Sequence, residues 1–405
     1  MLTDKNILLG VTGSIAAYKS IYLARLLVEA GANVFPVLTP SATRFVGALS
    51  FSAITGNRAI TNLWASAEAG EIGHVELAHK ADALIIAPAT ANSIAQIALG
   101  LADAPLSAIA LSTRAPLLIA PAMEDGMWNH PATQQHIVTL QERGALIAFP
   151  TAGALASGRI GQGRMLEPEQ LLSLVSKILS PQDLDGYTFT ISAGPTQEPL
   201  DPVRYLSNYS SGKMGYALAE EAFRRGAQVH LVSGPSHLPR PYGVQFTSVQ
   251  TTLEMRDAVK GSLQTSDVLI MAAAPADYRP TQLSDSKLKK NASLTSIPLT
   301  ANPDILSTLS EERKKCFTVG FAAESDNLIE NAKRKLEVKE LDLIVANDIT
   351  APNAGFGGDQ NTVTLLRPDS PPVPLATMTK TEVANIILDQ IVTFKSRRES
   401  GDPHE

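Results

Sequence analysis

The chain has 405 residues, enough for two or three domains with large hydrophobic cores. Its net charge of -6, with 44% hydrophobic and 18% charged residues, resembles neither a basic nucleic-acid-binding surface nor a disordered acidic polymer. The apolar runs are too short to span a bilayer, and we expect no signal peptide before the first of them. The single cysteine, Cys316, excludes an intrachain disulfide. We therefore expect a cytoplasmic protein that binds neither nucleic acid nor membrane.

Strand-like apolar runs alternate with helical patterns through the first half of the chain. The expected strands are Asn6–Val11, Asn33–Leu38, Ala83–Ala87, Pro116–Ala120 and Ala145–Phe149, and the expected helices are Ile15–Ala30, Ser93–Leu99, Thr133–Arg143 and Pro168–Leu179. A strand followed by a helix, repeated, predicts parallel strands with crossover helices. The first unit is therefore expected to be a three-layer α/β domain.

A polar, turn-rich segment, Ser180–Gly186, separates this series from a second one. The second series has expected strands at Tyr187–Ile191, Gln228–Val232, Asp267–Ala274, Phe317–Ala322 and Leu343–Ala346, and helices at Met214–Arg225, Leu253–Val259 and Asn327–Lys339. A last helix is expected to begin with a capping box of Thr379 and Glu382. We place domains at 1–185 and 186–395, with a polar tail at 396–405.

Small and hydroxyl-bearing residues follow three of the expected strands in the first domain. The first strand runs into GVTGSIAAYK, the second into VLTPS and the third into APATAN. Backbone N–H groups and hydroxyls at such edges can bind an anion, so their convergence suggests a phosphate-bearing cofactor; a tight turn without a ligand is the alternative. The candidate contacts are Gly13, Ser14, Ile15, Thr39, Ser41, Pro88, Ala89, Thr90 and Ala91.

The second domain has an anion-binding candidate where a helix begins at Gly212–Met214. A P-loop interpretation fails, because Walker A requires glycine at the position of Ser207 and serine or threonine at that of Met214. Ser210, Ser211 and the helix N-terminus still offer several donors to a phosphate or an acyl phosphate, and a capped helix start is the alternative.

Other motifs of the second domain fit a nucleotide. The strand end with Met271, Ala272 and Ala273 leaves room for a base or ribose, and Asp277 could ligate a hydroxyl or Mg²⁺. The KLKK run, Lys287–Lys290, is either solvated surface charge or a clamp on a triphosphate.

Three further stretches offer base and phosphate contacts. Pro303, Asp304, Ile305 and Leu306 belong to an NPDIL helix start whose backbone donors could contact a pyrimidine. Phe321 ends a strand and could stack on the base. Lys335 and Lys339 lie on one helix face, where lysines are usually solvated but can also bind phosphate.

Several motifs resemble flavin-dependent cysteine decarboxylases. In chain order these are GSIAAYK from Gly13, His74, APATAN from Ala87, a PAM-x-x-x-MW stretch at Pro121–Trp128 and SGRIGQGRMLE from Ser157. With SAGPTQEPLDPVRYLSNYSSGKMG at Ser192–Gly215, the chain resembles the bifunctional family in which phosphopantothenoylcysteine decarboxylase is fused to phosphopantothenate–cysteine ligase. The resemblance covers essentially the whole chain.

The resemblance implies that the first domain is flavodoxin-like, belongs to the homo-oligomeric flavin-containing cysteine decarboxylases and binds FMN. It implies that the second is a Rossmann-like ligase domain that uses CTP and Mg²⁺. The implied substrates are 4'-phosphopantothenate, cysteine and CTP, and the implied assembly has a trimeric flavoprotein core with dimeric ligase domains. His74 would assist oxidation of the cysteine moiety. Asn208 would hold the acyl oxygen of an acyl-cytidylate, and Lys287 would neutralise phosphate charge. Without the resemblance, His74 would be an ordinary hydrogen-bonded histidine at a helix start.

Two positions depart from the family pattern. The decarboxylase motif has an asparagine for the substrate carboxylate where this chain has Glu124, and a cysteine that reprotonates the enethiol where it has Ser157. Glutamate facing an anionic substrate would cost about 1–4 kcal/mol at close range. A serine hydroxyl is a far weaker acid than a thiol. We therefore expect impaired decarboxylation.

Three interpretations remain open. The chain is a complete bifunctional enzyme, or a ligase whose flavoprotein half serves as a non-catalytic module for oligomerisation or binding, or an enzyme whose flavoprotein half has a changed substrate or product.

Overall fold

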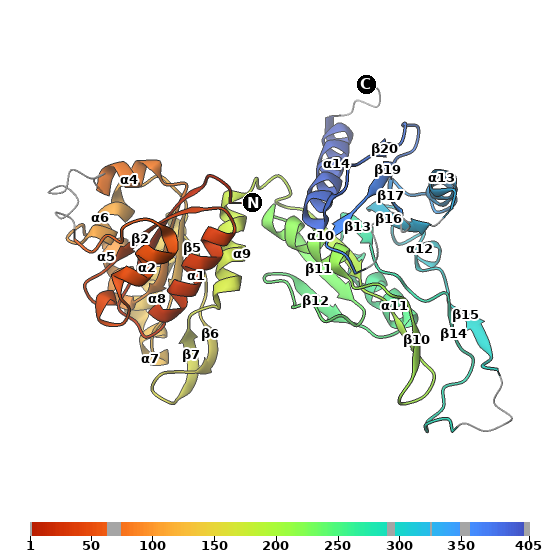
Figure 1. Ribbon diagram of the computed structural model, residues 1–405, viewed down its shortest axis with the longest axis horizontal. Coiled ribbons are helices and arrows are strands. Elements are labelled where there is room, and N and C mark those ends of the chain that lie inside the picture. The colour runs from red at the N-terminus through yellow and green to blue at the C-terminus, as the bar shows by residue number, and fades with distance from the viewer. Residues whose placement is uncertain (1, 63–73, 290–295, 325, 349–356, 401–405) are drawn as a thin grey trace. The chain divides into compact units, whose positions relative to one another are not determined.

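The computed structural model describes residues 2–62, 74–289, 296–324, 326–348 and 357–400. The chain divides into two units, Met1–Ser180 and Pro181–Glu405, and each is an α/β domain (Figure 1). No helix in the described part of the chain is long and apolar enough to cross a membrane.

The first unit contains a five-stranded parallel sheet. Its strands are β1 (Asn6–Val11), β2 (Asn33–Leu38), β3 (Ala83–Ala89), β4 (Leu117–Pro121) and β5 (Leu146–Ile147), in the spatial order β2-β1-β3-β4-β5. This is the strand order of flavodoxin-like folds, which bind ligands at the carboxyl ends of the strands.

Helices lie on both sides of this sheet (Figure 1). They are α1 (Ala17–Glu29), α2 (Ala48–Thr55), α4 (His74–Lys80), α5 (Ala91–Leu99), α6 (Pro105–Ser112), α8 (Pro131–Glu142) and α9 (Pro168–Leu179), with a short 3₁₀ helix, η1 (Ala42–Arg44). Helix α1 packs against α2 and α9, and α5 packs against α6 and α8. Leu84 and Ile86 of the central strand are fully buried against Ile94 of α5 and Ile109 of α6.

A hairpin extends from the first unit beyond the sheet. Strands β6 (Thr151–Ala154) and β7 (Ile160–Arg164) pair antiparallel, and the short helix α7 (Asp125–Trp128) contacts β7. A side chain at Gly163 would place its Cβ 2.0 Å from the carbonyl oxygen of Met123, so the hairpin can approach that backbone only because this residue is glycine.

The second unit is built on an eight-stranded mixed sheet. Its strands are β8 (Thr188–Ala193), β11 (Gln228–Ser233), β12 (Gln245–Ser248), β13 (Val268–Met271), β16 (Phe317–Glu324), β17 (Leu343–Asp348), β19 (Val363–Leu366) and β20 (Val373–Pro374), in the order β12-β11-β8-β13-β16-β17-β19-β20. The first six strands in that order are parallel and follow the Rossmann arrangement, and β19 and β20 add an antiparallel edge.

Two hydrophobic cores cover the two faces of this sheet. The helices are α10 (Lys213–Arg224), α11 (Thr252–Ser262), α12 (Ile305–Thr308), α13 (Leu328–Val338) and α14 (Lys380–Ser400). One core joins Phe189 and Ile191 to α10 and α14, and the other joins Leu269 and Ile344 to α11, α12 and α13. Alternate residues of the buried strands therefore point to opposite helical layers.

Short antiparallel strand pairs lie outside the large sheet. Strands β9 (Gln197–Pro199) and β10 (Tyr205–Ser207) form one, and β14 (Tyr278–Pro280) and β15 (Leu299–Ala301) form another. Strands β18 (Gln360–Asn361) and β21 (Met378–Thr379) pair just before α14.

The predicted α/β class, with a flavodoxin-like first domain and a Rossmann-like second domain, is confirmed. The capping box is present, because Glu382 accepts from the N–H and hydroxyl of Thr379 and donates its own N–H to that hydroxyl. Helix α14 continues to Ser400, past the expected start of the polar tail, and residues 401–405 lie outside the described residues. The antiparallel edge was not predicted.

Candidate functional site

The three predicted strand edges of the first unit meet in space. A side chain at Gly13 would place its Cβ 2.4 Å from the Cβ of Ser41, so the first and second edges are in close contact. The hydroxyl of Thr12 donates to the carbonyl oxygen of Pro88 and accepts from the N–H of Thr90, which joins the first edge to the third. The predicted convergence of these edges is therefore present.

The individual residues at these edges have different environments. The hydroxyl of Thr90 accepts from Ser93 N–H and caps α5, and the hydroxyl of Thr39 accepts from Ala42 N–H. Ala89 and Pro88 are buried within β3, whereas Ile15 is 59% exposed beside Ser14. Ala91 is the first residue of α5. His74 is the first residue of α4 and follows residues outside the described part of the chain.

A cavity of about 460 Å³ lies beside these edges. Ser14, Ile15 and Lys19 line it from the start of α1, and Glu124 lines it from the turn before α7. Lys19 is buried, and its ammonium donates to the carbonyl oxygen of Met165 and to the carboxylate of Glu167. Burial alone would raise the pKa of Glu167, but the hydrogen bond and charge of Lys19 outweigh it and lower that pKa.

The two departures from the family pattern contact each other. The hydroxyl of Ser157 lies 3.0 Å from Oε1 of Glu124 and donates to it. Both side chains are near the surface, and the N–H of Arg159 donates to the serine oxygen at 3.4 Å. The one proton that Ser157 carries is therefore directed at a carboxylate of this chain.

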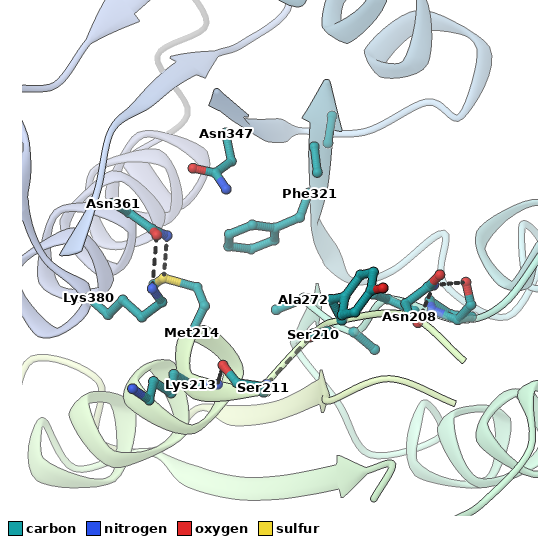
Figure 2. Close-up of a pocket in the computed structure, with 17 residues that line it drawn as sticks. Asn208, Ser210, Ser211, Lys213, Met214, Ala272, Phe321, Asn347, Asn361 and Lys380 are labelled. Carbon is teal, nitrogen blue, oxygen red and sulfur yellow. Dashed lines mark hydrogen bonds between the residues drawn. The ribbon is translucent and has the colours of Figure 1, made fainter. Parts of the chain in front are cut away.

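The second unit has a cavity of about 350 Å³ at the carboxyl ends of its parallel strands (Figure 2). The residues that line it come from the starts of α10 and α14, from the ends of β13, β16 and β17, and from β18. They are Asn208–Met214, Ala272–Pro275, Phe321–Ala323, Asn347, Asn361 and Lys380. In a Rossmann arrangement this edge, near the point where the strand order reverses, is the expected ligand site.

The N-terminus of α10 is held against the sheet by two glycines. Gly212 has a φ of +82° at the N-cap position, and a Cβ at Gly215 would lie 2.6 Å from the Cβ of Ala193. Helix α10 therefore begins close to the end of β8, with the backbone of Ser210–Gly212 along the cavity. The positive end of a helix dipole at this place favours an anionic ligand.

The side-chain amide nitrogen of Asn208 is hydrogen-bonded to other residues of the protein. Its Nδ2 donates to the carbonyl oxygens of Ala274 and Pro275 at 2.9 and 3.0 Å (Figure 2). Two carbonyl acceptors fix the orientation of the amide, because its oxygen would be repelled there. The group of Asn208 left for a ligand in this conformation is Oδ1, an acceptor, rather than the donor that an acyl oxygen requires.

Phe321 and Asn347 extend from adjacent strands toward the cavity (Figure 2). The Oδ1 of Asn347 is inaccessible to solvent and has no hydrogen-bond partner in the described residues. A buried acceptor without a partner is costly, and a ligand donor would satisfy it.

Two lysines, Lys213 and Lys380, also line this cavity. Lys213 donates to the carbonyl oxygen of Gly357 and to the carboxylate of Asp359. Lys380 is buried, and its ammonium donates to Gly358 O, Gln360 O and Asn361 Oδ1. Burial lowers the pKa of Lys380, and the nearby charge of Lys213 lowers it further.

The remaining predicted nucleotide contacts lie outside this cavity. Lys339 donates to the carboxylate of Asp304 at 2.5 Å, so the structure pairs two residues that were predicted from separate motifs. Burial alone would raise the pKa of Asp304, but the hydrogen bond from Lys339 outweighs it and lowers that pKa. Asp304 also caps α12 by accepting from Ser307 N–H.

Other predicted contacts are divided between core and surface. Ile305, Leu306 and Met271 are buried in the core, so only their backbone groups could reach a ligand, and Pro303 directly precedes Asp304. Asp277 and Lys287 are exposed, and Lys335 is half-buried on α13. Lys290 of the KLKK run lies outside the described residues. The described residues contain no cluster of three or more histidine, cysteine, aspartate or glutamate side chains that could hold a metal.

Sequence reasoning missed Asn347, Asn361 and Lys380 as cavity residues. The polar end of an otherwise apolar strand was a signal for Asn347. Asn361 and Lys380 lie next to the antiparallel edge and the last helix, so no strand-end pattern marked them.

Comparisons with known proteins agree with this architecture. The Flavoprotein family profile matches residues 1–180, and the profile of the DNA/pantothenate metabolism flavoprotein C-terminal domain matches residues 184–394. The chain is 44% identical over 396 residues to the coenzyme A biosynthesis bifunctional protein CoaBC of Vibrio vulnificus strain YJ016, covering 97% of this chain and 98% of that one. It is 42% identical over 401 residues to the protein of the same name from Bacillus subtilis strain 168, covering 98% and 99%.

A crystal structure of the C-terminal domain of a coenzyme A biosynthesis bifunctional protein CoaBC is also similar, with 42% identity, 53% of this chain and 98% of that chain covered, and a TM-score of 0.46. The fold and the matching profiles define a two-domain flavoprotein. The chain belongs to the family of bifunctional coenzyme A biosynthesis proteins.

Proposed function

We propose that the second unit is a CTP-dependent phosphopantothenate–cysteine ligase. A carboxylate oxygen of 4'-phosphopantothenate attacks the α-phosphorus of CTP, the bond to the β-phosphate breaks, and pyrophosphate leaves. The amine of cysteine then attacks the acyl carbon of the acyl-cytidylate, CMP leaves, and the nitrogen loses a proton. The observation that carries this proposal is that Asn208, the N-terminus of α10 and Phe321 line one cavity at the switch point of a Rossmann sheet.

The cavity offers a distinct group for each part of this reaction. The N-terminus of α10 favours phosphate charge, and Phe321 offers a face on which a base can stack. Asn208 presents an acceptor, so it is better suited to receive an N–H of the attacking amine than to hold the acyl oxygen. Lys287, Lys335 and Lys339 lie outside this cavity and are our proposed source of positive charge for phosphates that extend beyond it.

Mg²⁺ fits as a companion of the nucleotide. The ion usually binds through one or two carboxylates and the substrate phosphates, and it keeps several waters. Asp277 is exposed directly before β14 and is our proposed protein ligand. The ion would neutralise phosphate charge when bound.

We further propose that the first unit binds FMN and decarboxylates phosphopantothenoylcysteine poorly. Gly13, Ser14, Ser41 and Thr90 are our proposed contacts of the flavin phosphate, because the strand ends that carry them meet so closely that a Cβ at Gly13 would collide with the side chain of Ser41. Flavin supplies oxidation and reduction of the cysteine moiety when bound, and His74 is proposed to assist the oxidation.

The Ser157–Glu124 hydrogen bond supports the impairment. A family cysteine in the position of Ser157 supplies a proton late in the reaction; here the hydroxyl is a weaker acid, and its proton points to Glu124. The carboxylate also faces the place where the substrate carboxylate is expected. The alternative, a flavoprotein half that serves only assembly or binding, predicts no decarboxylation at all.

Product analysis tests both proposals. The purified protein is incubated with CTP, Mg²⁺, cysteine and 4'-phosphopantothenate, and products are identified by mass spectrometry alongside a flavin absorbance spectrum. We expect phosphopantothenoylcysteine to accumulate with little 4'-phosphopantetheine. Rapid release of carbon dioxide with full conversion to 4'-phosphopantetheine would contradict the impairment, and absence of every ligation product would contradict the ligase.

A further inference from the structure

A buried carboxylate organises the turn between β9 and β10. The side chain of Asp201 is fully buried. Its Oδ1 accepts from the N–H groups of Val203 and Arg204, both at 2.8 Å. Its Oδ2 accepts from Nε of Arg204 at 3.0 Å and from the terminal guanidinium nitrogen of the same residue. Hydrogen bonds to the Asp201 carboxylate therefore stabilise this turn.

The same carboxylate reaches a distant loop. Oδ2 of Asp201 also accepts from the N–H of Leu288 at 3.1 Å, and the guanidinium of Arg204 donates to the carbonyl oxygen of Leu288 at 2.8 Å. Both backbone groups of Leu288 are thus bonded to one ion pair. A further link joins the N–H of Ser284 to the carbonyl oxygen of Leu200 at 3.2 Å.

These contacts connect two of the residues to which the proposed ligation assigns chemistry, Asn208 and Lys287. Lys287 lies between the linked residues Ser284 and Leu288, so the path of its backbone is set by both links. Arg204 is followed directly by β10, which leads into Asn208. Asn208 is in turn bonded to Ala274 and Pro275. One buried carboxylate therefore joins the chain segments that carry Asn208 and Lys287.

We propose that Asp201 is a positioning residue that fixes Lys287 relative to Asn208 for formation of the acyl-cytidylate. This inference rests on the proposed ligase function and adds a residue that acts through Lys287 without touching the substrates. A displacement of about 1 Å in a reacting group can cost roughly 10²-fold in rate, so an anchor next to Lys287 matters for turnover.

The charge of Asp201 is suited to this task. The Arg204 guanidinium beside it, together with the backbone N–H donors, holds the pKa of the Asp201 carboxyl well below its usual range. The group therefore stays ionised and keeps all of its acceptors at every pH where the enzyme is expected to work. An asparagine has nearly the same shape but provides only one acceptor oxygen.

The test is a double-mutant cycle on the full chain, read as CTP-dependent pyrophosphate release with Mg²⁺ and 4'-phosphopantothenate under single-turnover conditions. Asp201→Asn is expected to lower the single-turnover rate of pyrophosphate release roughly 10- to 100-fold. The CTP concentration that gives half of the maximal rate is expected to change less. In the Lys287→Gln background, the same substitution is expected to change the remaining rate less than about twofold, because the group being positioned is already gone.

A matched control is Asp257→Asn. Asp257 also accepts from a neighbouring arginine, Arg256, but the pair is exposed on α11, away from the cavity, and its loss is expected to leave the rate within about twofold. Leu288→Pro is a second probe: in a loop outside both cores it removes the N–H that Asp201 accepts, and it also fixes φ at residue 288 and restricts the backbone of Lys287. It should reproduce the rate loss even if Asp201→Asn folds poorly.

The outcomes distinguish a failure of the proposed ligase function from a failure of the positioning role of Asp201. A wild-type protein that releases no pyrophosphate contradicts the ligase function itself. An active wild-type protein in which Asp201→Asn has no effect, or in which its effect multiplies fully with that of Lys287→Gln, contradicts the positioning role. Equal losses in Asp201→Asn and in Asp257→Asn would contradict it as well.

Discussion

Glu124 and Ser157, the two positions that the motif resemblance singles out as departures, are hydrogen-bonded to each other. Restoring one of them alone would leave the other without its partner in the same cavity. We therefore expect their effects on catalysis to be coupled rather than additive.

The double variant Glu124→Asn with Ser157→Cys is predicted to raise 4'-phosphopantetheine formation at least about tenfold over the unmodified chain. The thiol supplies a stronger acid, and the amide removes a negative charge facing the substrate carboxylate. Mass spectrometry of the product made from phosphopantothenoylcysteine measures this, with Ser157→Cys alone as the control. An unchanged yield from the double variant would mean that these residues do not limit the reaction.

Lys19 lines the cavity of the first unit, and its ammonium is paired with the carboxylate of Glu167. Because the pKa of Glu167 is lowered in the folded protein, its contribution to stability is full above its ordinary pKa of about 4.3 and is lost as the pH falls below that value. Glu167→Gln also leaves the buried Lys19 ammonium without its carboxylate.

We predict that Glu167→Gln lowers the Tm of the first unit by about 2–4 °C at pH 7 and that the difference is smaller at pH 3. Thermal unfolding followed by flavin absorbance measures the shift. A difference in Tm that stays the same at both pH values would show that the ion pair is not its source.

At the scale of elements, the start of α10 determines whether the ligase cavity exists. Gly215 lets this helix approach β8, because any Cβ there would lie 2.6 Å from the Cβ of Ala193 and 2.9 Å from the carbonyl oxygen of Ser192. Neither the neighbouring backbone nor the alanine can move away as a flexible side chain could.

Gly215→Val is predicted to cost about 1–3 kcal/mol of stability in the second unit and to reduce pyrophosphate release by displacing the helix N-terminus. Gly261→Ala on α11 is the control, since its Cβ would meet nothing within 4 Å. Chemical denaturation and the pyrophosphate assay together check the prediction. A Gly215→Val protein with the stability and rate of the control would contradict the close-packing argument.

Long elements were predictable from the sequence because their periodicity is local. The helix over 168–179 and the strands Asn6–Val11 and Asn33–Leu38 agree with the structure at both ends. The β9–β10 hairpin was not predicted, because its strands are only three residues long and carry no clear alternation.

The candidate sites also contain a part that the sequence predicts and a part that it does not. Strand-end motifs indicated that Gly13, Ser41 and Thr90 would converge, since parallel strands share an edge. The bonds of Ser157 to Glu124 and of Leu288 to Asp201 join residues 33 and 87 positions apart through irregular segments. No local pattern reports such contacts, so these partners came only from the structure.

At the scale of the whole molecule, the two units have separate hydrophobic cores. The clusters around Phe189 and around Leu269 contain residues of the second unit only, and the cluster around Ile86 contains residues of the first. Damage to one core should therefore leave the other intact.

Phe189→Ala is predicted to destabilise the second unit by about 3–5 kcal/mol, because Phe189 is fully buried in the core between the sheet and α10. Pyrophosphate release should fall at moderate temperature while the flavin absorbance spectrum is unchanged. Simultaneous loss of both signals in one unfolding transition would contradict independent cores.

The central claim is that the Rossmann-type unit joins CTP to the carboxylate of 4'-phosphopantothenate in the cavity beside Asn208. The most direct measurement is pyrophosphate release by the full chain with CTP, Mg²⁺ and 4'-phosphopantothenate in the absence of cysteine. We predict a burst of pyrophosphate that requires CTP and 4'-phosphopantothenate and falls roughly 10²- to 10³-fold in Lys287→Gln. No pyrophosphate from the wild-type chain, or release that does not depend on 4'-phosphopantothenate, would contradict the claim.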